Sequence, residues 1–86
     1  MKLNPFAIMT NLFDGTGLIF NPNTNAAMSL NKTGVYLWKR LKEGATEEEM
    51  ISGLMSRYSG VTEEHASADV KAFLQELRNR SLLSED

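Results

Sequence analysis

The stretch from Leu30 to Trp38 constrains the fold most, because the pattern of apolar residues changes there. Before it, apolar residues come in short runs interrupted by Asn, Asp, Gly and Pro, as in strands joined by turns. After it, they recur every three or four residues, the spacing of one helix face. Asn31 is predicted to cap the first helix by accepting a backbone N–H of Thr33 or Gly34. The chain is therefore predicted to pass from strands into helices here.

Three short strands are predicted before that helix. The first lies within residues 6–13, and the second is Leu18–Phe20. Residues 14–17 between them are typical of a hairpin turn, since Gly15 and Gly17 can adopt positive φ. The turn-forming run Asn21–Asn25 then precedes a third strand, Ala26–Leu30. Together they predict a meander with two open edges.

Three helices are predicted after the sheet. The first spans residues 32–42 and ends at Gly44, where a left-handed glycine can follow the last turn. Thr46 and Glu49 have the spacing of a capping box, which starts the second helix, and Thr62 is predicted to cap the third. The apolar stripes of the three helices are Leu37, Trp38 and Leu41; Met50, Ile51, Leu54, Met55 and Tyr58; and Ala66, Val70, Phe73, Leu74 and Leu77.

Strands followed by helices in a chain of 86 residues predict a single domain, residues 1–86, of class α+β. We expect a three-stranded antiparallel sheet followed by three helices that cover one sheet face, an arrangement similar to a winged helix-turn-helix. Met50 and Met55 are expected in the core. The apolar tail Ser81–Leu83 is expected either to lie on the core or to pair with a strand.

The composition argues against several classes of function. The chain has no Cys and one His, so it lacks the residues for a thiol nucleophile, a catalytic triad or a multi-histidine metal site. The formal net charge of −2 argues against a surface built to hold nucleic acid. No apolar run approaches ~20 residues and no signal peptide is evident, which predicts a cytoplasmic protein without a membrane partner. No catalytic residue, cofactor or metal ligand is predicted.

The remaining class is a binding module with an open strand edge. If Ala26–Leu30 lies at the edge, its main-chain groups can pair with an extended peptide. The third helix would flank that edge, and its residues Lys71, Gln75 and Arg78 form one stripe at spacings of four and three. This stripe is cationic at both ends. The sequence is equally compatible with this stripe as a solvated surface and as a binding surface.

Several segments, taken in order, carry a family resemblance. Leu18–Pro22 is an apolar strand that ends in a turn, and Leu30–Trp38 holds a Leu-Asn-x-Thr-Gly run that leads to an aromatic residue. Gly44–Thr46 is the break before the second helix. Matching positions in the last two helices are Leu54, Tyr58, Asp69, Val70, Phe73, Leu74 and Leu77. In this order they resemble the PqqD family of pyrroloquinoline quinone (PQQ) biosynthesis and its relatives, the RiPP recognition elements. The family often has Gly where this chain has Ser81.

The resemblance implies a peptide chaperone that presents the leader of a ribosomally made precursor peptide to a modifying enzyme, commonly a radical S-adenosylmethionine (radical SAM) enzyme. It does not imply the PQQ pathway itself. In the family the leader adds as a strand beside the third strand, in a groove with the third helix. The implied peptide-binding residues are Ala26, Ala27, Met28, Ser29 and Leu30 on the strand and Lys71, Leu74, Gln75 and Arg78 on the helix. The cationic stripe further predicts acidic residues in the leader.

Two alternatives of other classes remain. A winged-helix DNA-binding protein would use the third helix for recognition, although Glu63, Glu64, Asp69 and Glu76 would face phosphates poorly. A structural module would self-associate, as a homodimer, by pairing its open sheet edges. An enzyme is the least supported class, because no residue constellation for one is present.

Overall fold

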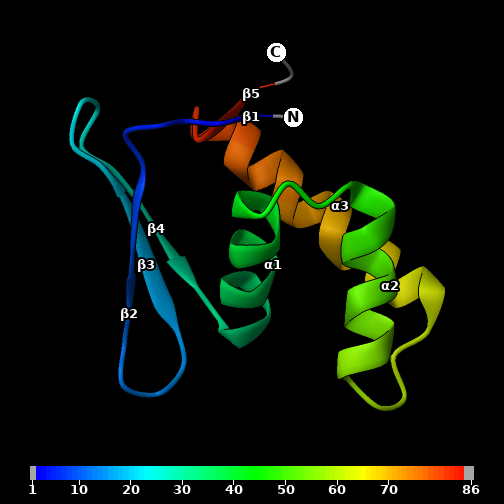
Figure 1. The fold of residues 1–86 in the computed structure, drawn as a ribbon. Coiled ribbons are helices and arrows are strands. Elements are labelled where there is room, and N and C mark those ends of the chain that lie inside the picture. The colour runs from blue at the N-terminus through cyan, green and yellow to red at the C-terminus, as the bar shows by residue number, and fades with distance from the viewer. Residues whose placement is uncertain (1, 85–86) are drawn as a thin grey trace.

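The computed structural model describes residues 2–84 and places a small sheet beside three helices (Figure 1). This confirms the predicted α+β fold, a three-stranded antiparallel sheet followed by three helices, and adds a pair of terminal strands. In chain order the elements are β1 (Lys2–Leu3), β2 (Ile8–Asn11), β3 (Gly17–Asn21), β4 (Ala26–Leu30), α1 (Lys32–Lys42), α2 (Glu47–Arg57), α3 (Glu63–Asn79) and β5 (Leu83–Ser84). Within residues 2–84, no helix combines the length and the apolar character needed to cross a membrane.

The sheet is a meander in the order β2-β3-β4, with every pair antiparallel. In β3, Ile19 points into the core while Leu18 and Phe20 point outward, as the pleat requires. The hairpin from β2 to β3 contains Gly15 at φ +87°, as predicted. Gly17 does not use the positive φ that a glycine allows. It packs closely instead, since a Cβ there would lie 2.9 Å from a methyl carbon of Val35.

The helix ends follow the predicted capping chemistry. Asn31 Oδ1 accepts the N–H of Gly34 at 2.8 Å, which starts α1 at the predicted residue. Thr46 and Glu49 form both hydrogen bonds of the capping box, and Thr62 Oγ1 accepts the N–H of His65. These caps satisfy N–H groups that the first turn of each helix leaves without an intrahelical partner. Local sequence therefore sets where the three helices begin.

The core lies between the sheet and the helices, and its largest fully buried side chain is Trp38, which is 1% exposed. Met50 is fully buried there, but the prediction for Met55 was wrong, because that side chain is 40% exposed. Met55 follows Leu54 by one position and therefore lies about 100° round the helix, past the face that packs against α3. Figure 1 shows α2 on the far side of α1 from the sheet.

The apolar tail does both of the things predicted for it. Leu82 and Leu83 are buried, and Leu83 pairs with Leu3 in the two-stranded sheet of β1 and β5. The turn into this tail places Ser81 at φ +59°, a left-handed conformation that favours Gly. This gives a physical reason for a Gly at this position in proteins of the resembling family.

Candidate peptide-binding site

The open edge of the sheet is the outer side of β4. Within residues 2–84, β3 pairs with one side of β4 and no strand pairs with the other. In an antiparallel ladder, successive residues direct their N–H and C=O alternately to the two sides of a strand. The N–H of Leu12 donates to Thr16 O at 2.8 Å, so Thr16 and every second residue after it direct their main-chain groups toward β2. The residues between them in β3 direct theirs toward β4. In β4, the residues opposite Leu18 and Phe20 are Ser29 and Ala27, and their main-chain groups therefore point to the open edge.

A groove of about 290 Å³ runs beside this edge, and we call it the β4 groove. Its apolar side chains come from three elements: Met28 on β4, Leu37 on α1 and Phe73 on α3. The remaining lining residues are Ser29, Asn31, Thr33, Gly34, Asp69 and Ala72. The groove therefore joins a strand edge to a partly apolar wall, which suits an extended peptide whose alternate side chains point toward α3.

The predicted strand residues fall on or beside the β4 groove. Met28 and Ser29 line it, and Ala27 is exposed on the same strand. Ala26 is half-buried, and Leu30 is 3% exposed and belongs to the core. The strand is thus at the sheet edge, as the sequence predicted, and two of its five predicted residues line the groove.

The structure does not bring the predicted α3 residues into the groove lining. Leu74 is fully buried in the core and does not line the groove. Lys71 and Gln75 are exposed, and Gln75 donates a hydrogen bond to Asn79 at 2.9 Å. Arg78 is partly buried. Peptide contact by these residues stays a prediction.

The groove side of α3 is instead made by Asp69, Ala72 and Phe73, which share one face at spacings of three and four residues. At 3.6 residues per turn, Lys71 and Arg78 lie on roughly the opposite face. The apolar stripe identified the buried face of α3, but not which neighbouring face turns toward β4. The one available signal was Phe73, an aromatic residue at the margin of that stripe.

Arg80, just after α3, contacts the open edge and was not predicted. Its Nη1 donates to the carbonyl oxygen of Ala27 at 2.9 Å, while its Nε donates to Glu76 Oε1 at 2.6 Å. The ion pair with Glu76 holds the guanidinium over the end of β4. One outward carbonyl of the edge is therefore already occupied. No local pattern announces this contact between residues 53 positions apart.

Resolved pKa shifts lie away from the β4 groove. Backbone and side-chain hydrogen bonds from Thr46 lower the pKa of Glu49, and those from Thr16 lower the pKa of Asp14. Both carboxylates are acceptors in local caps or turns. Among residues 2–84, no group of three His, Cys, Asp or Glu side chains could hold a metal ion. The β4 groove thus offers main-chain pairing and apolar contact.

Comparison with known proteins gives matches at the levels of family and structure. The family model described as coenzyme PQQ synthesis protein D (PqqD) matches residues 17–83. No curated protein matches.

Two solved structures are similar. "TbiB1 in Complex with the TbiA(beta) Leader Peptide" is 26% identical with a TM-score of 0.89, covering 100% of this chain and 98% of that one. "Lasso peptide synthetase B1 complexed with the leader peptide" is 22% identical with a TM-score of 0.79, covering 91% of this chain and 89% of that one, and it supports the fold alone. The family match spans most of the chain and includes the strand, the groove and the helices described above, and the chain therefore belongs to the PqqD family.

Proposed function

We propose that this chain binds the leader of a ribosomally made precursor peptide by strand addition to β4. The observation that carries the proposal is the open edge of β4 beside a groove walled by α3. The similar structure of TbiB1, which covers the whole chain, is a complex with a leader peptide and supports it. Membership of the PqqD family agrees with a binding protein rather than an enzyme.

Main-chain and side-chain contacts divide the work of binding in this proposal. The N–H and C=O of Ser29 pair with the leader. Alternate side chains of the leader enter the groove between Met28 and Phe73. Main-chain pairing supplies affinity that depends little on leader sequence, whereas the groove side chains select it. The small side chain of Ala72 leaves room for a larger leader residue.

We further infer that the bound leader is presented to a peptide-modifying enzyme in the cytoplasm. A radical SAM enzyme is the proposed partner, on the ground of family resemblance, and the PQQ pathway is one of several that fit. The prediction of an acidic leader rested on Lys71 and Arg78, but neither lines the β4 groove. The charged residue of that lining is Asp69, which would not attract acidic side chains. We therefore place the selective contacts at Met28, Ala72 and Phe73.

The test separates main-chain pairing from side-chain contact at one residue. Peptides are first selected on the wild-type protein from a displayed library of random sequences. Ser29→Pro removes the outward N–H at an edge position where proline is tolerated, while Ser29→Ala keeps it. Ser29→Pro removes one hydrogen bond at the edge and weakens the adjacent ones, so it is expected to lower the affinity for the peptide about tenfold. Ser29→Ala should bind as the wild type does; equal affinity of all three proteins would contradict strand addition.

Self-association through the same edge is the second candidate. It is favoured by the outer sheet face, where Ile8 is 58%, Leu18 38% and Phe20 39% exposed. Two β4 strands could pair around a two-fold axis and join these faces. Light scattering across a concentration series distinguishes the two functions. A dimer that persists on dilution, together with a failure to select any peptide from the library, would favour self-association over leader binding.

A further inference from the structure

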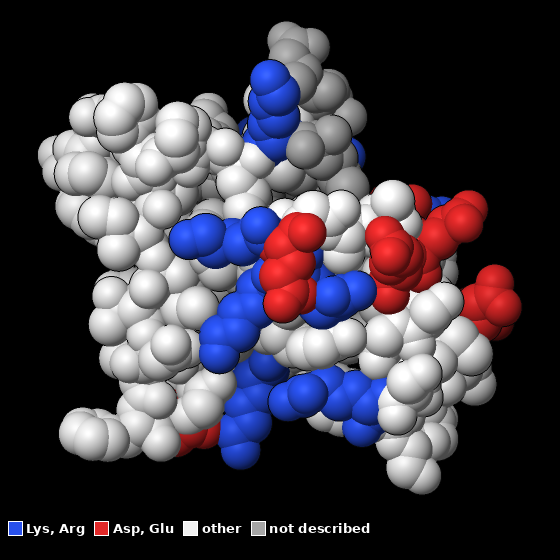
Figure 2. Space-filling model, viewed as in Figure 1, with Lys and Arg blue, Asp and Glu red and all other residues white. Residues whose placement is uncertain are grey.

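A second groove, larger than the first, lies on the other side of α1, and we call it the basic groove. Its volume is about 930 Å³, and the β2–β3 hairpin, α1 and α2 enclose it. Figure 2 shows Lys and Arg side chains gathered on this face over α1, between the sheet and α2, with acidic side chains among and beside them. Its lining residues are Asn11, Leu12, Phe13, Gly15, Lys32, Val35, Tyr36, Lys39, Arg57 and Tyr58. Three of them are cations and none is acidic, in a chain whose formal net charge is −2.

The cation on α2 is held in place by aromatic rings. The guanidinium of Arg57 lies 4.9 Å from the centroid of Tyr36 and 5.9 Å from that of Tyr58. Such contacts orient a guanidinium while leaving its edge N–H groups able to donate. The hydroxyl of Tyr36 lies against Gly53, where an added Cβ would collide with it. A glycine inside α2, which costs a helix about 1 kcal/mol relative to alanine, is thereby explained by the placement of Tyr36.

The carboxylates around this groove are engaged elsewhere. Glu43 pairs with Arg40 at 2.7 Å, outside the lining. Asp14 accepts hydrogen bonds from the backbone and side chain of Thr16 in its own turn, and its carboxylate also interacts electrostatically with Lys32 of the lining. Neither Lys39 nor Arg57 forms an ion pair with another residue in the described range 2–84. The groove therefore presents positive charge at Lys39 and Arg57, whereas the charge of Lys32 is partly offset by Asp14.

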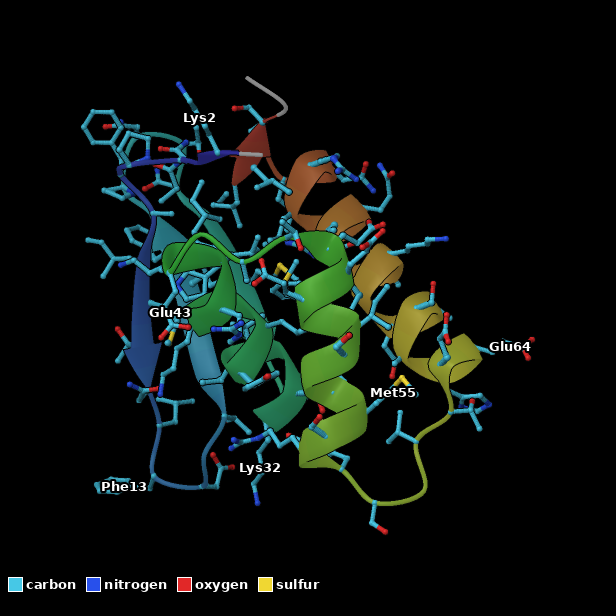
Figure 3. The ribbon with its side chains drawn as sticks, turned by 45° about the vertical axis from the view of Figure 1, so that its right-hand side comes forward. Lys2, Phe13, Lys32, Glu43, Met55 and Glu64 are labelled. Carbon is cyan, nitrogen blue, oxygen red and sulfur yellow. The ribbon has the colours of Figure 1, made fainter. Side chains whose placement is uncertain are left out.

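The two grooves come close to each other at the start of α1, where adjacent residues line them. Asn31 lines the β4 groove, and its neighbour Lys32 lines the basic groove. Figure 3 shows Lys32 at the start of α1 and Phe13 at the tip of the β2–β3 hairpin, at the same end of the molecule. A peptide paired with β4 that continues past Leu30 advances about 3.3 Å per residue, so it reaches this junction within a few residues. One extended chain can thus enter both grooves.

We propose that the basic groove holds an acidic segment of the same precursor peptide whose leader pairs with β4. This proposal rests on the proposed function. Carboxylates of the segment accept hydrogen bonds from Arg57 and Lys39, and an apolar residue packs against Tyr36 and Phe13. Charge complementarity and continuity with the β4 groove identify the occupant. The segment adds affinity and fixes how far the peptide extends beyond the sheet edge.

The test uses peptides selected from the random library on the wild-type protein. Selected sequences should contain Asp or Glu clusters at a constant distance from the segment that pairs with β4. One such peptide and an analogue with Asn and Gln in place of the acids are titrated by calorimetry against three variants. The double variant Lys39→Glu with Arg57→Glu should lose about tenfold affinity for the acidic peptide and none for the analogue. Ser29→Pro should weaken both peptides, and the matched control Lys2→Glu should weaken neither.

Several outcomes would overturn the proposal. One is the absence of acidic clusters, and another is equal loss for both peptides in the double variant. Lys39→Glu alone, an exposed change, covers the case in which the double variant does not fold, and it should lose a smaller part of the same affinity. Tighter binding of oligothymidylate than of the acidic peptide would assign the groove to nucleic acid instead.

If no peptide is selected at all, the proposed function fails, and the basic groove is still tested by nuclear magnetic resonance. A short acetylated peptide of alternating Glu and Gly is titrated into labelled protein. Chemical-shift changes confined to Tyr36, Lys39, Arg57 and Tyr58 would support an acidic ligand for this groove. Their absence would overturn that as well.

Discussion

The two grooves beside α1 use different chemistry although one helix separates them. The β4 groove offers main-chain groups and apolar side chains, with Asp69 as its charged residue. The basic groove offers three side-chain cations and two tyrosine rings. Strand pairing tolerates many ligand sequences and is weakly sensitive to salt, whereas contacts with cations depend on ligand charge and weaken as salt rises. The two grooves therefore offer two kinds of selection, by apolar fit in the β4 groove and by charge in the basic groove.

The largest expected effect concerns the core that supports both grooves. Leu74→Ala should lower the free energy of unfolding by about 3 kcal/mol, because it leaves a cavity at a fully buried position. Lys71→Ala, one turn earlier and exposed, should change it by less than about 0.5 kcal/mol. Urea denaturation measures both. A stable Leu74→Ala that loses peptide binding would instead make Leu74 a contact residue, as the sequence had suggested.

Gly53→Ala should damage the basic groove alone. In an exposed helix this change usually adds about 1 kcal/mol of stability, but here the new Cβ collides with the Tyr36 hydroxyl. We expect a net loss of about 1 kcal/mol, from overpacking, and weaker binding of acidic peptides with strand pairing intact. The control is Ser52→Ala, the preceding exposed residue of α2, which should not reduce stability. A Gly53→Ala protein more stable than wild type would show that Tyr36 moves freely.

Arg80→Gln should increase the affinity of the β4 groove for the leader, whereas the changes above reduce stability or binding. The wild-type guanidinium occupies the Ala27 carbonyl, so a leader that pairs there must displace it. Removing that competition should raise leader affinity about fivefold, the value of one hydrogen bond of about 1 kcal/mol. Arg40→Gln breaks a similar surface ion pair with Glu43 and should leave affinity unchanged. Weaker binding by Arg80→Gln would mean that Arg80 contacts the peptide itself.

The smallest effect is a pH dependence outside both grooves. Hydrogen bonds from Thr46 hold the pKa of Glu49 below its ordinary value in the folded state, so the cap stabilises the fold above the unfolded-state pKa. That contribution disappears as the pH falls through the lowered, folded-state pKa. Urea midpoints measured from neutral to acidic pH should therefore fall less in Glu49→Gln than in wild type. Parallel curves for the two proteins would exclude a role for this cap, and peptide affinity should be the same in both.

Features encoded by adjacent residues could be predicted from the sequence. The bounds of α1 and β4 follow from Asn31 and from the turn before Ala26, because a cap or a turn involves only a few neighbours. The edge position of β4 followed from the meander, since its last strand has a neighbour on one side only. These features located one wall of the candidate site.

Features set by packing between distant elements could not be predicted. The face of α3 that turns toward β4 depends on how the helix crosses the sheet, so Asp69 and Ala72 were missed. The contact of Arg80 with Ala27 joins residues 53 positions apart and has no local signature. The basic groove likewise needs the hairpin and two helices together, so Lys39 and Arg57 have no shared pattern in the sequence.

The pairing of β1 with β5 has a practical consequence for assembly. Lys2 lies opposite Ser84, so the two ends of the described chain leave the fold at the same place. A tether fused there, at either end, would start from nearly the same point relative to both grooves. A flexible tether to an enzyme would raise the local concentration of a captured peptide to the millimolar range when its length matches the span. The position of these two ends is therefore compatible with fusion to a second protein at either end.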